Sequence, residues 1–258
     1  DNIRTLMNDL RKCIRIVLSG LQESKYPISY SEQDNILRSY MLMIRGADYN
    51  YKRIYPKDFI GPGSFTLQLE NIIESKEDTT IVSIRDNDCV TEKADGERKL
   101  LYIASNGKIY LIDTNMNVIF TGSKTNEKTI FNSLLDGEHI REDKYGKYLN
   151  LFAGFDIYYI NGKSVREYPF IRYLTEDTAD EKQEQGEVIS KKFRLELLNE
   201  LIELLKPISI LETSTNDEIQ PNQNKQSNDL MVKCKGLGSV AYWLLPGNKK
   251  EGYCNEKV

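Results

Sequence analysis

The motif Lys93-Ala94-Asp95-Gly96-Glu97-Arg98 combines a candidate nucleophile with a fixed cation at short spacing. Apolar stretches at 81–84 and 100–103 flank it, which predicts a strand, a loop and a second strand rather than a solvated run of charges. A lysine stripped of water in such a setting loses its proton near neutral pH and becomes a nucleophile. The Asp-Gly pair permits a tight turn, and Arg98 offers a rigid fork of donors for hydroxyl or phosphate oxygens.

Two acidic segments follow the lysine motif. Asp136-Gly137-Glu138 ends an apolar stretch, and Phe155-Asp156 interrupts another. The first segment could be a turn with a surface carboxylate, and Phe155 could simply be part of the core. Asp156 is less easily explained in this way, because a buried carboxylate requires a partner.

The composition is typical of a soluble globular protein. With 258 residues, 40% hydrophobic and 29% charged, the chain can form one large domain with extensions. A net charge of −4 argues against bulk electrostatic binding of nucleic acid, so any handling of phosphate must be local. His139 is the only histidine, which argues against Ser-His or Cys-His catalysis and against histidine-rich metal sites.

Other features of the chain indicate the cellular compartment in which the protein works. The four cysteines lie far apart without a C-x-x-C spacing, which favours a reducing compartment over a disulfide framework or a zinc site. The apolar runs are too short for a transmembrane span. The first residues carry neither a methionine nor a signal peptide, so we expect a fragment of a longer chain.

The elements that must position these residues follow from the spacing of apolar side chains. Helical spacing predicts helices over 1–22, from Ser31 to a stop at Gly46, and over 192–205. Alternation and turn residues predict an antiparallel meander over 80–121, with turns at 105–108 and 113–115, and strands at 64–67, 130–140 and 151–160. We expect loops at 56–63 and 174–187.

Taken in order, the segments around Lys93, Glu138 and Phe155 resemble the covalent nucleotidyltransferase superfamily, which comprises mRNA-capping guanylyltransferases and the DNA and RNA ligases. Residues 59–67 look like the segment that precedes the lysine in capping enzymes. The likeness covers roughly residues 56–206. It is strongest to the guanylyltransferase module of multifunctional capping enzymes from large DNA viruses.

The resemblance implies an α+β fold, in which an antiparallel-sheet nucleotidyltransferase domain of the ligase and capping-enzyme type follows N-terminal helices and precedes an OB-fold domain. The implied domains are a helical junction at 1–48, the nucleotidyltransferase domain at 49–212, a linker at 213–228 and the incomplete beginning of an OB-fold at 229–258.

The resemblance also implies roles for single residues. Lys93 would attack the α-phosphate of GTP and form a lysine-linked GMP. Arg98 would bind ribose hydroxyls or phosphate, Glu138 would contact the ribose or hold magnesium or manganese, and Phe155 would stack on guanine. The 5′-diphosphate end of an RNA would then take the GMP, which makes a capped end.

Further residues are implied in supporting roles. Asp95 would order the loop around Lys93, and Asp156 would support the site. Lys233 and Lys235 fit the spacing of a Lys-x-Lys strand that binds phosphates, although residues 228–233 look more like the segment just after that strand, where the OB-fold domain begins. Arg194 looks like an arginine with a structural role in viral relatives.

The pattern departs from the family at one point, because the usual Asp-Gly or Glu-Gly metal-binding strand is not found; 216–219 has about the right place but lacks the glycine. The absent strand supports one alternative, a non-catalytic module of a capping complex. A second alternative is an ATP-dependent polynucleotide ligase, which shares the lysine chemistry. We expect GTP and the 5′ end of nascent RNA as partners, together with triphosphatase and methyltransferase modules, and no membrane. The expected location is the cytoplasm, or a viral factory or virion if the protein is viral.

Overall fold

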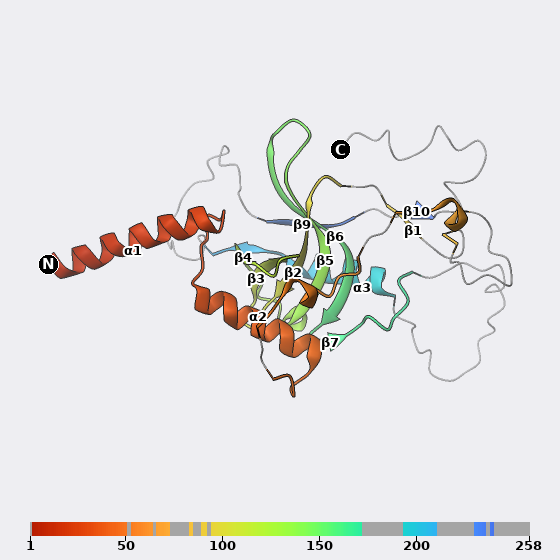
Figure 1. Ribbon diagram of the computed structural model, residues 1–258, viewed down its shortest axis with the longest axis horizontal. Coiled ribbons are helices and arrows are strands. Elements are labelled where there is room, and N and C mark those ends of the chain that lie inside the picture. The colour runs from red at the N-terminus through yellow and green to blue at the C-terminus, as the bar shows by residue number, and fades with distance from the viewer. Residues whose placement is uncertain are drawn as a thin grey trace.

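An antiparallel sheet forms the centre of the structure, a computed structural model (Figure 1). It describes residues 2–50, 53–63, 66–72, 83–84, 89–91, 94–171, 193–210, 230–235 and 238–239. The helices are α1 (Asn2–Leu21), α2 (Tyr30–Arg45) and α3 (Arg194–Leu205), with short 3-10 helices η1 (Pro56–Asp58), η2 (Leu69–Asn71) and η3 (Lys128–Ile130). The strands are β1 (Cys89–Val90), β2 (Glu97–Ile103), β3 (Lys108–Asp113), β4 (Val118–Lys124), β5 (Ser133–Glu142), β6 (Tyr148–Ile160), β7 (Lys163–Ser164), β8 (Ile208–Ser209), β9 (Met231–Cys234) and β10 (Gly238–Ser239).

The main sheet has the strand order β7-β6-β5-β2-β3-β4-β8, and β9 pairs in parallel with β6. β2, β3 and β4 form the predicted meander from Glu97 onward, with both predicted turns between them, whereas β1 pairs with β10 in a separate two-stranded sheet. The first turn needs a glycine, because Gly107 has φ of +78° and a Cβ there would lie 2.2 Å from the Thr125 carbonyl oxygen. The antiparallel sheet agrees with the predicted α+β class.

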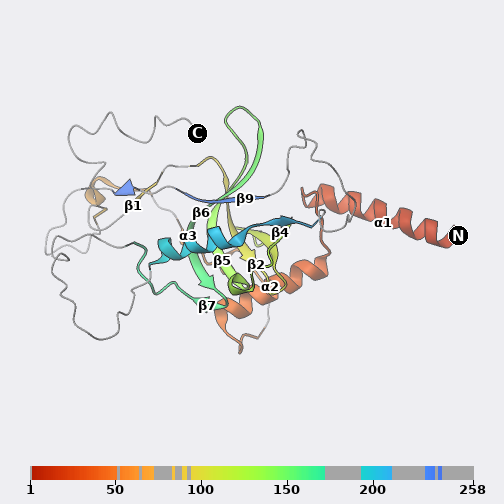
Figure 2. The same cartoon turned by 180° about the vertical axis from the view of Figure 1, so that it is seen from behind.

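Each face of the sheet is covered by one helix, as a comparison of Figures 1 and 2 shows. α2 buries Ile36, Tyr40 and Met41 against one face. α3 buries four leucines against the other face, at positions 197, 198, 201 and 205. This spacing makes one stripe along the helix, and each buried leucine contributes about 1.5–3 kcal/mol relative to an exposed one.

The ends of these helices agree with the sequence in part. The Ser29 hydroxyl caps α2 by accepting a hydrogen bond from the Glu32 N–H at 3.1 Å, and Gly46 follows its last residue as predicted. α3 ends at Leu205 and is capped by Lys206, which has a left-handed backbone and directly precedes Pro207. Lys192, the predicted first residue of this helix, lies outside the described residues.

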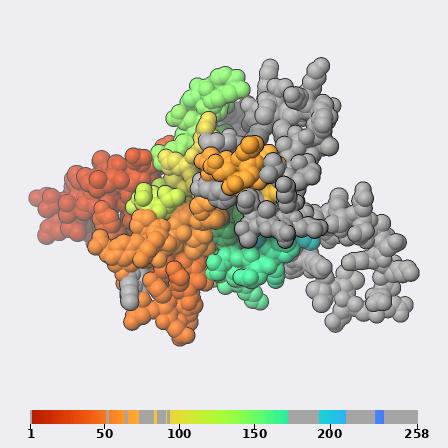
Figure 3. Space-filling view, turned by 45° about the vertical axis from the view of Figure 1, so that its right-hand side comes forward, coloured from red at the N-terminus to blue at the C-terminus, as the bar shows by residue number. Residues whose placement is uncertain are grey.

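α1 forms as predicted, but none of its side chains is buried. It projects from the rest of the molecule as an arm, seen in red in Figure 3. Within the residues that the structure describes, no helix combines the length and apolar character needed to cross a membrane.

The predictions for residues 64–67, 174–187 and 213–258 have different outcomes. The strand at 64–67 is wrong for Thr66 and Leu67, because the chain there turns into η2, whose Asn71 side chain accepts the Gln68 N–H. The loop at 174–187 and the linker at 213–228 lie outside the described residues. In 229–258, β9 extends the central sheet, and the predicted OB-fold is not confirmed.

A buried polar cluster lies near the start of β2. Lys99 is only 2% exposed, and its Nζ lies 2.8 Å from Glu97 Oε2 and 3.5 Å from His139 Nδ1. An ammonium can only donate, so Nδ1 accepts and the histidine carries its proton on Nε2, which donates to Asn150 Oδ1 at 2.9 Å. Burial lowers the pKa of His139, which is therefore neutral in the folded protein at neutral pH.

We predict that folding stability decreases as the pH falls from 8 to about 5.5, through the ordinary histidine pKa of about 6.5. The unfolded chain gains a proton on His139 in this range, whereas the folded protein, with its lowered pKa, resists protonation. Urea unfolding at several pH values measures the slope. Because His139 is the only histidine, His139→Gln should flatten it, and an equal slope in the variant would contradict the assignment.

Candidate active site

Arg98 and Asp136 form a buried ion pair on the face of the sheet covered by α2. Arg98 Nε donates to Asp136 Oδ1 at 3.1 Å, and Nη2 donates to Oδ2 at 2.6 Å. The Tyr158 hydroxyl donates to the same Oδ2 at 2.6 Å. Asp136 has no exposed surface, and its hydrogen bonds raise the pKa of Arg98 further above its ordinary value. The carboxylate therefore holds the guanidinium in one orientation.

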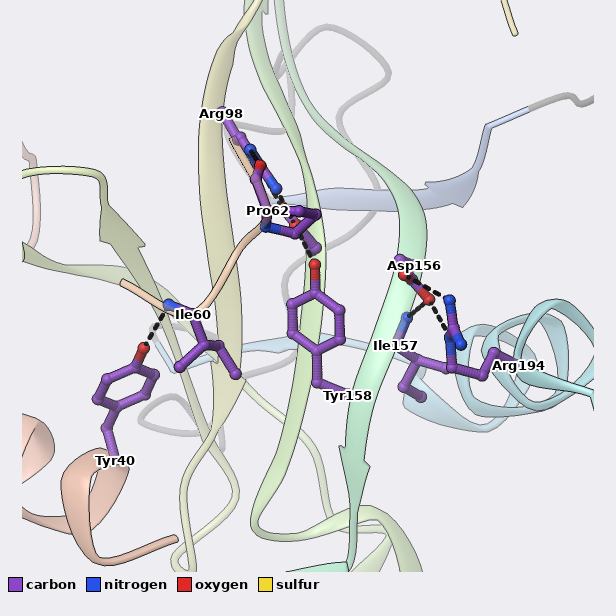
Figure 4. A network of polar contacts seen from close by, with 9 residues as sticks. Tyr40, Ile60, Pro62, Arg98, Asp156, Ile157, Tyr158 and Arg194 are labelled. Carbon is purple, nitrogen blue, oxygen red and sulfur yellow. Dashed lines mark hydrogen bonds and ion pairs between the residues drawn. The ribbon is translucent and has the colours of Figure 1, made fainter. Parts of the chain in front are cut away.

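The loop before the lysine motif reaches the same guanidinium. Arg98 Nη1 donates to the Pro62 carbonyl oxygen at 2.5 Å, and the Arg98 Cζ lies 5.5 Å from the centre of the Phe59 ring. Figure 4 shows the bond to Pro62, with Tyr158 beside it. Arg98 also lies over the Phe155 ring, at 5.8 Å. Both distances are within the range of cation–π contacts, so two aromatic rings and three acceptors fix this side chain.

Two irregularities in β6 bring aromatic side chains to this site. In the ladder between β5 and β6, Tyr158 and Phe155 of β6 have no paired residue on β5. The two register shifts lie directly after Leu134 and directly after Asp136 of β5. In a regular strand, these two residues would face opposite sides of the sheet, because side chains alternate. The extra residues allow the Tyr158 hydroxyl to bond Asp136 while the Phe155 ring contacts Arg98.

Glu138 and Lys235 meet next to Phe155. The Lys235 backbone N–H donates to the Gly154 carbonyl oxygen at 2.8 Å, which continues the parallel pairing of β9 with β6. Lys235 Nζ lies 3.7 Å from Glu138 Oε1 and 5.8 Å from the centre of the Phe155 ring. Its side chain is only 11% exposed. The parallel strand thus brings a lysine remote in sequence into the site.

One carboxylate oxygen in this group lacks a partner. Glu138 Oε2 is buried and has no hydrogen-bond partner among the described residues. Buried polar atoms are almost always satisfied, so an oxygen in this state marks a place for a donor or a cation. In the described part of the chain no group of three or more His, Cys, Asp or Glu side chains could hold a metal ion.

The contacts described above do not include the remaining residues that were predicted for the site. Lys93 lies outside the described residues. Asp95 is exposed two residues beyond it in the loop, and Lys233 is exposed on β9. These positions leave their predicted roles untested.

Asp156 has the partner that its apolar surroundings required. It forms a forked ion pair with Arg194 of α3, with Nε–Oδ1 at 2.8 Å and Nη2–Oδ2 at 3.2 Å (Figure 4). Arg194 Nη1 also donates to the Tyr168 carbonyl oxygen at 2.6 Å. The pair joins α3 to β6 and to the chain after β7.

Sequence reasoning gave no role to Asp136, Tyr158 or Phe59. Asp136 belonged to a recognised motif, and a carboxylate at the end of an apolar stretch could have been assigned to Arg98. Nothing in the sequence marks Tyr158, because it reaches the site through a register shift.

The same part of the chain matches known proteins. Residues 75–200 match the family model described as mRNA capping enzyme, catalytic domain. The chain is also similar to a probable mRNA-capping enzyme of Acanthamoeba polyphaga mimivirus, with 29% identity over 165 residues. That alignment covers 64% of this chain and 12% of the relative, so the chain corresponds to a small part of a much larger protein. The matches confirm the resemblance to capping-enzyme guanylyltransferase modules.

Proposed function

We propose that the protein is an mRNA guanylyltransferase, because residues 75–200 match the family model described as mRNA capping enzyme, catalytic domain. It transfers GMP from GTP, through a lysine-GMP intermediate, to the 5′-diphosphate end of RNA. The observation that carries the proposal is the convergence of Arg98, Glu138, Phe155 and Lys235, within a domain that also contains Lys93. This group offers cations, an unsatisfied carboxylate oxygen and an aromatic ring, which suit the phosphates, the ribose and the base of a nucleotide.

In the proposed first step, the neutral amine of Lys93 attacks the α-phosphorus of GTP. A nitrogen–phosphorus bond forms, the bond from the α-phosphorus to the bridging oxygen breaks, and pyrophosphate leaves with the electron pair. The amine loses its proton to solvent. In the second step, a terminal oxygen of the RNA 5′-diphosphate attacks the same phosphorus and releases Lys93.

The other residues bind and orient the nucleotide. Lys235 provides positive charge for phosphate oxygens and lies over the Phe155 ring, on which the guanine stacks. The Arg98 guanidinium is oriented by Asp136 and the Pro62 carbonyl oxygen, and its remaining N–H groups are directed to ribose or phosphate oxygens. Electrostatic positioning of this kind supplies most of the catalysis in phosphoryl transfer.

Glu138 is the residue proposed to hold a divalent ion. Its unsatisfied Oε2 fits magnesium or manganese, since magnesium is usually bound by one or two carboxylates together with substrate phosphates and water. When bound, such an ion neutralises charge on the triphosphate.

We predict that Phe155→Ala weakens GTP binding by about 1–3 kcal/mol, because the variant loses the stacking surface for the base. Calorimetric titration with GTP measures this. Tyr148→Ala is the matched control: it removes an aromatic ring from the same strand at a position that is 43% exposed and remote from Arg98. Equal GTP affinity in Phe155→Ala and the unaltered protein would show that Phe155 has a purely structural role.

The proposed function is tested by nucleotide labelling followed by transfer. The protein is incubated with α-labelled GTP, or separately with α-labelled ATP, and magnesium or manganese. The labelled protein is then mixed with RNA that has a 5′-diphosphate or a 5′-monophosphate end. Label from GTP alone that moves only to the diphosphate RNA is the expected result. Label from ATP would indicate a ligase, and no label from either nucleotide on folded protein would indicate a non-catalytic module.

A further inference from the structure

A tyrosine of α2 fixes the loop that contacts Arg98. Tyr40 has no exposed surface, and its hydroxyl bonds to two backbone groups of the site loop, defined here as residues 58–62. It donates to the Asp58 carbonyl oxygen at 2.8 Å and accepts from the Ile60 N–H at 3.1 Å. Figure 4 shows the second of these bonds. One buried hydroxyl therefore satisfies both a donor and an acceptor of a loop that belongs to no strand of the sheet.

The start of the site loop is fixed by further contacts. The Asp58 carboxylate accepts the Tyr55 N–H at 2.9 Å through Oδ2, and its Oδ1 lies 3.8 Å from Arg45 Nη2, at the end of α2. The latter pair is partly exposed and contributes little. The Tyr40 hydroxyl is fully enclosed, so its two hydrogen bonds are the stronger constraint.

The other end of the site loop packs closely on Arg98. Phe59 and Pro62 contact the guanidinium, and Gly61 lies between them. A Cβ on Gly61 would lie 2.5 Å from Arg98 Nη2 and 2.6 Å from the Phe59 ring, so only glycine permits this approach. A displacement of the loop by a fraction of an ångström therefore changes the surroundings of the guanidinium.

We propose that Tyr40 is a positioning residue for the nucleotide site: by fixing the site loop, it sets the place of Phe59 and the Pro62 carbonyl oxygen and, through them, of Arg98. This inference rests on the proposed function. It gives α2, in the helical segment before the catalytic domain, a part in nucleotide binding through the backbone of the site loop.

The test compares three variants in adduct formation over a range of GTP concentrations. Tyr40→Phe removes the hydroxyl and keeps the ring in the core. Gly61→Ala moves the loop from the opposite side. Tyr102→Phe is the matched control, because it removes another buried hydroxyl from the same core, one that bonds to Ser39 of α2 instead of fixing the site loop through two backbone groups as Tyr40 does.

The first two variants are expected to raise the GTP concentration for half-maximal rate about five- to twentyfold, the size of one or two lost hydrogen bonds. Their maximal rates should stay within about twofold of the unaltered protein, since Lys93 is intact. Tyr102→Phe should match the unaltered protein in both quantities. A general loss of folding would lower the maximal rate instead, which separates positioning from a merely structural role.

Two results would overturn the inference. One is an unchanged GTP dependence in Tyr40→Phe; the other, if that variant does not fold, is an unchanged dependence in Gly61→Ala. Absence of any adduct in the unaltered protein would contradict the proposed function itself, and the inference with it. An adduct in the unaltered protein with no effect of the variants would contradict the inference alone.

Discussion

Lys93→Ala is expected to abolish formation of the nucleotide adduct, with a loss of at least about a thousandfold. The reason is chemical: the variant has no amine to attack the α-phosphorus, and the proposed role of Arg98 and Lys235 is to bind GTP rather than to attack it. The measurement is label from α-labelled GTP that remains on the protein after denaturation.

Lys93→Arg provides the matched control for charge. Arginine keeps a positive side chain at this position, but it stays protonated and is not a nucleophile. Both variants should therefore lack the adduct, while their thermal unfolding stays close to that of the unaltered protein. Adduct in either variant would show that another residue is the nucleophile.

Asp136→Ala is expected to destabilise the protein by about 3–5 kcal/mol, because it leaves the Arg98 guanidinium and the Tyr158 hydroxyl without their shared acceptor. Asp136 has no exposed surface, and the Arg98 side chain is 27% exposed, so water replaces little of the lost interaction. Urea unfolding measures the change. Adduct formation should fall as well, since Arg98 loses its orientation.

Asp34→Ala is the control for this prediction. Asp34 pairs with Arg38 along α2 at 2.8 Å, but their side chains are 43% and 50% exposed. Exposed pairs at this helical spacing contribute only about 0.3–0.5 kcal/mol. If Asp136→Ala costs no more than Asp34→Ala, the buried pair does not have the structural importance assigned to it.

The regular elements could be predicted because short-range patterns determine them. The meander from β2 to β4 follows from alternation and from turn residues such as Gly107, whose conformation few other residues adopt. The core face of α2 follows from helical spacing. For α1, spacing predicts the helix correctly but does not say what covers its apolar side, which is exposed in the structure.

The composition of the site was less predictable, because long-range pairing and register shifts create it. Phe155 and Glu138 could be selected by their place in the motifs, but the alternation rule fails at Phe155 and Tyr158, where β6 carries extra residues. Lys235 was expected to bind phosphate through its motif. Its actual neighbours depend on the parallel pairing of β9 with β6, which local pattern does not indicate. Tyr40 reaches the site only through the backbone of another segment.

The most direct test of the account is a mass measurement on the unaltered protein after incubation with GTP and magnesium or manganese. The protein is digested, and the peptide that contains Lys93 is identified and fragmented. We predict that this peptide gains the mass of one GMP, attached to Lys93, and that ATP gives no such product. A GMP on another residue, an AMP in its place, or unmodified peptide from folded protein would contradict it.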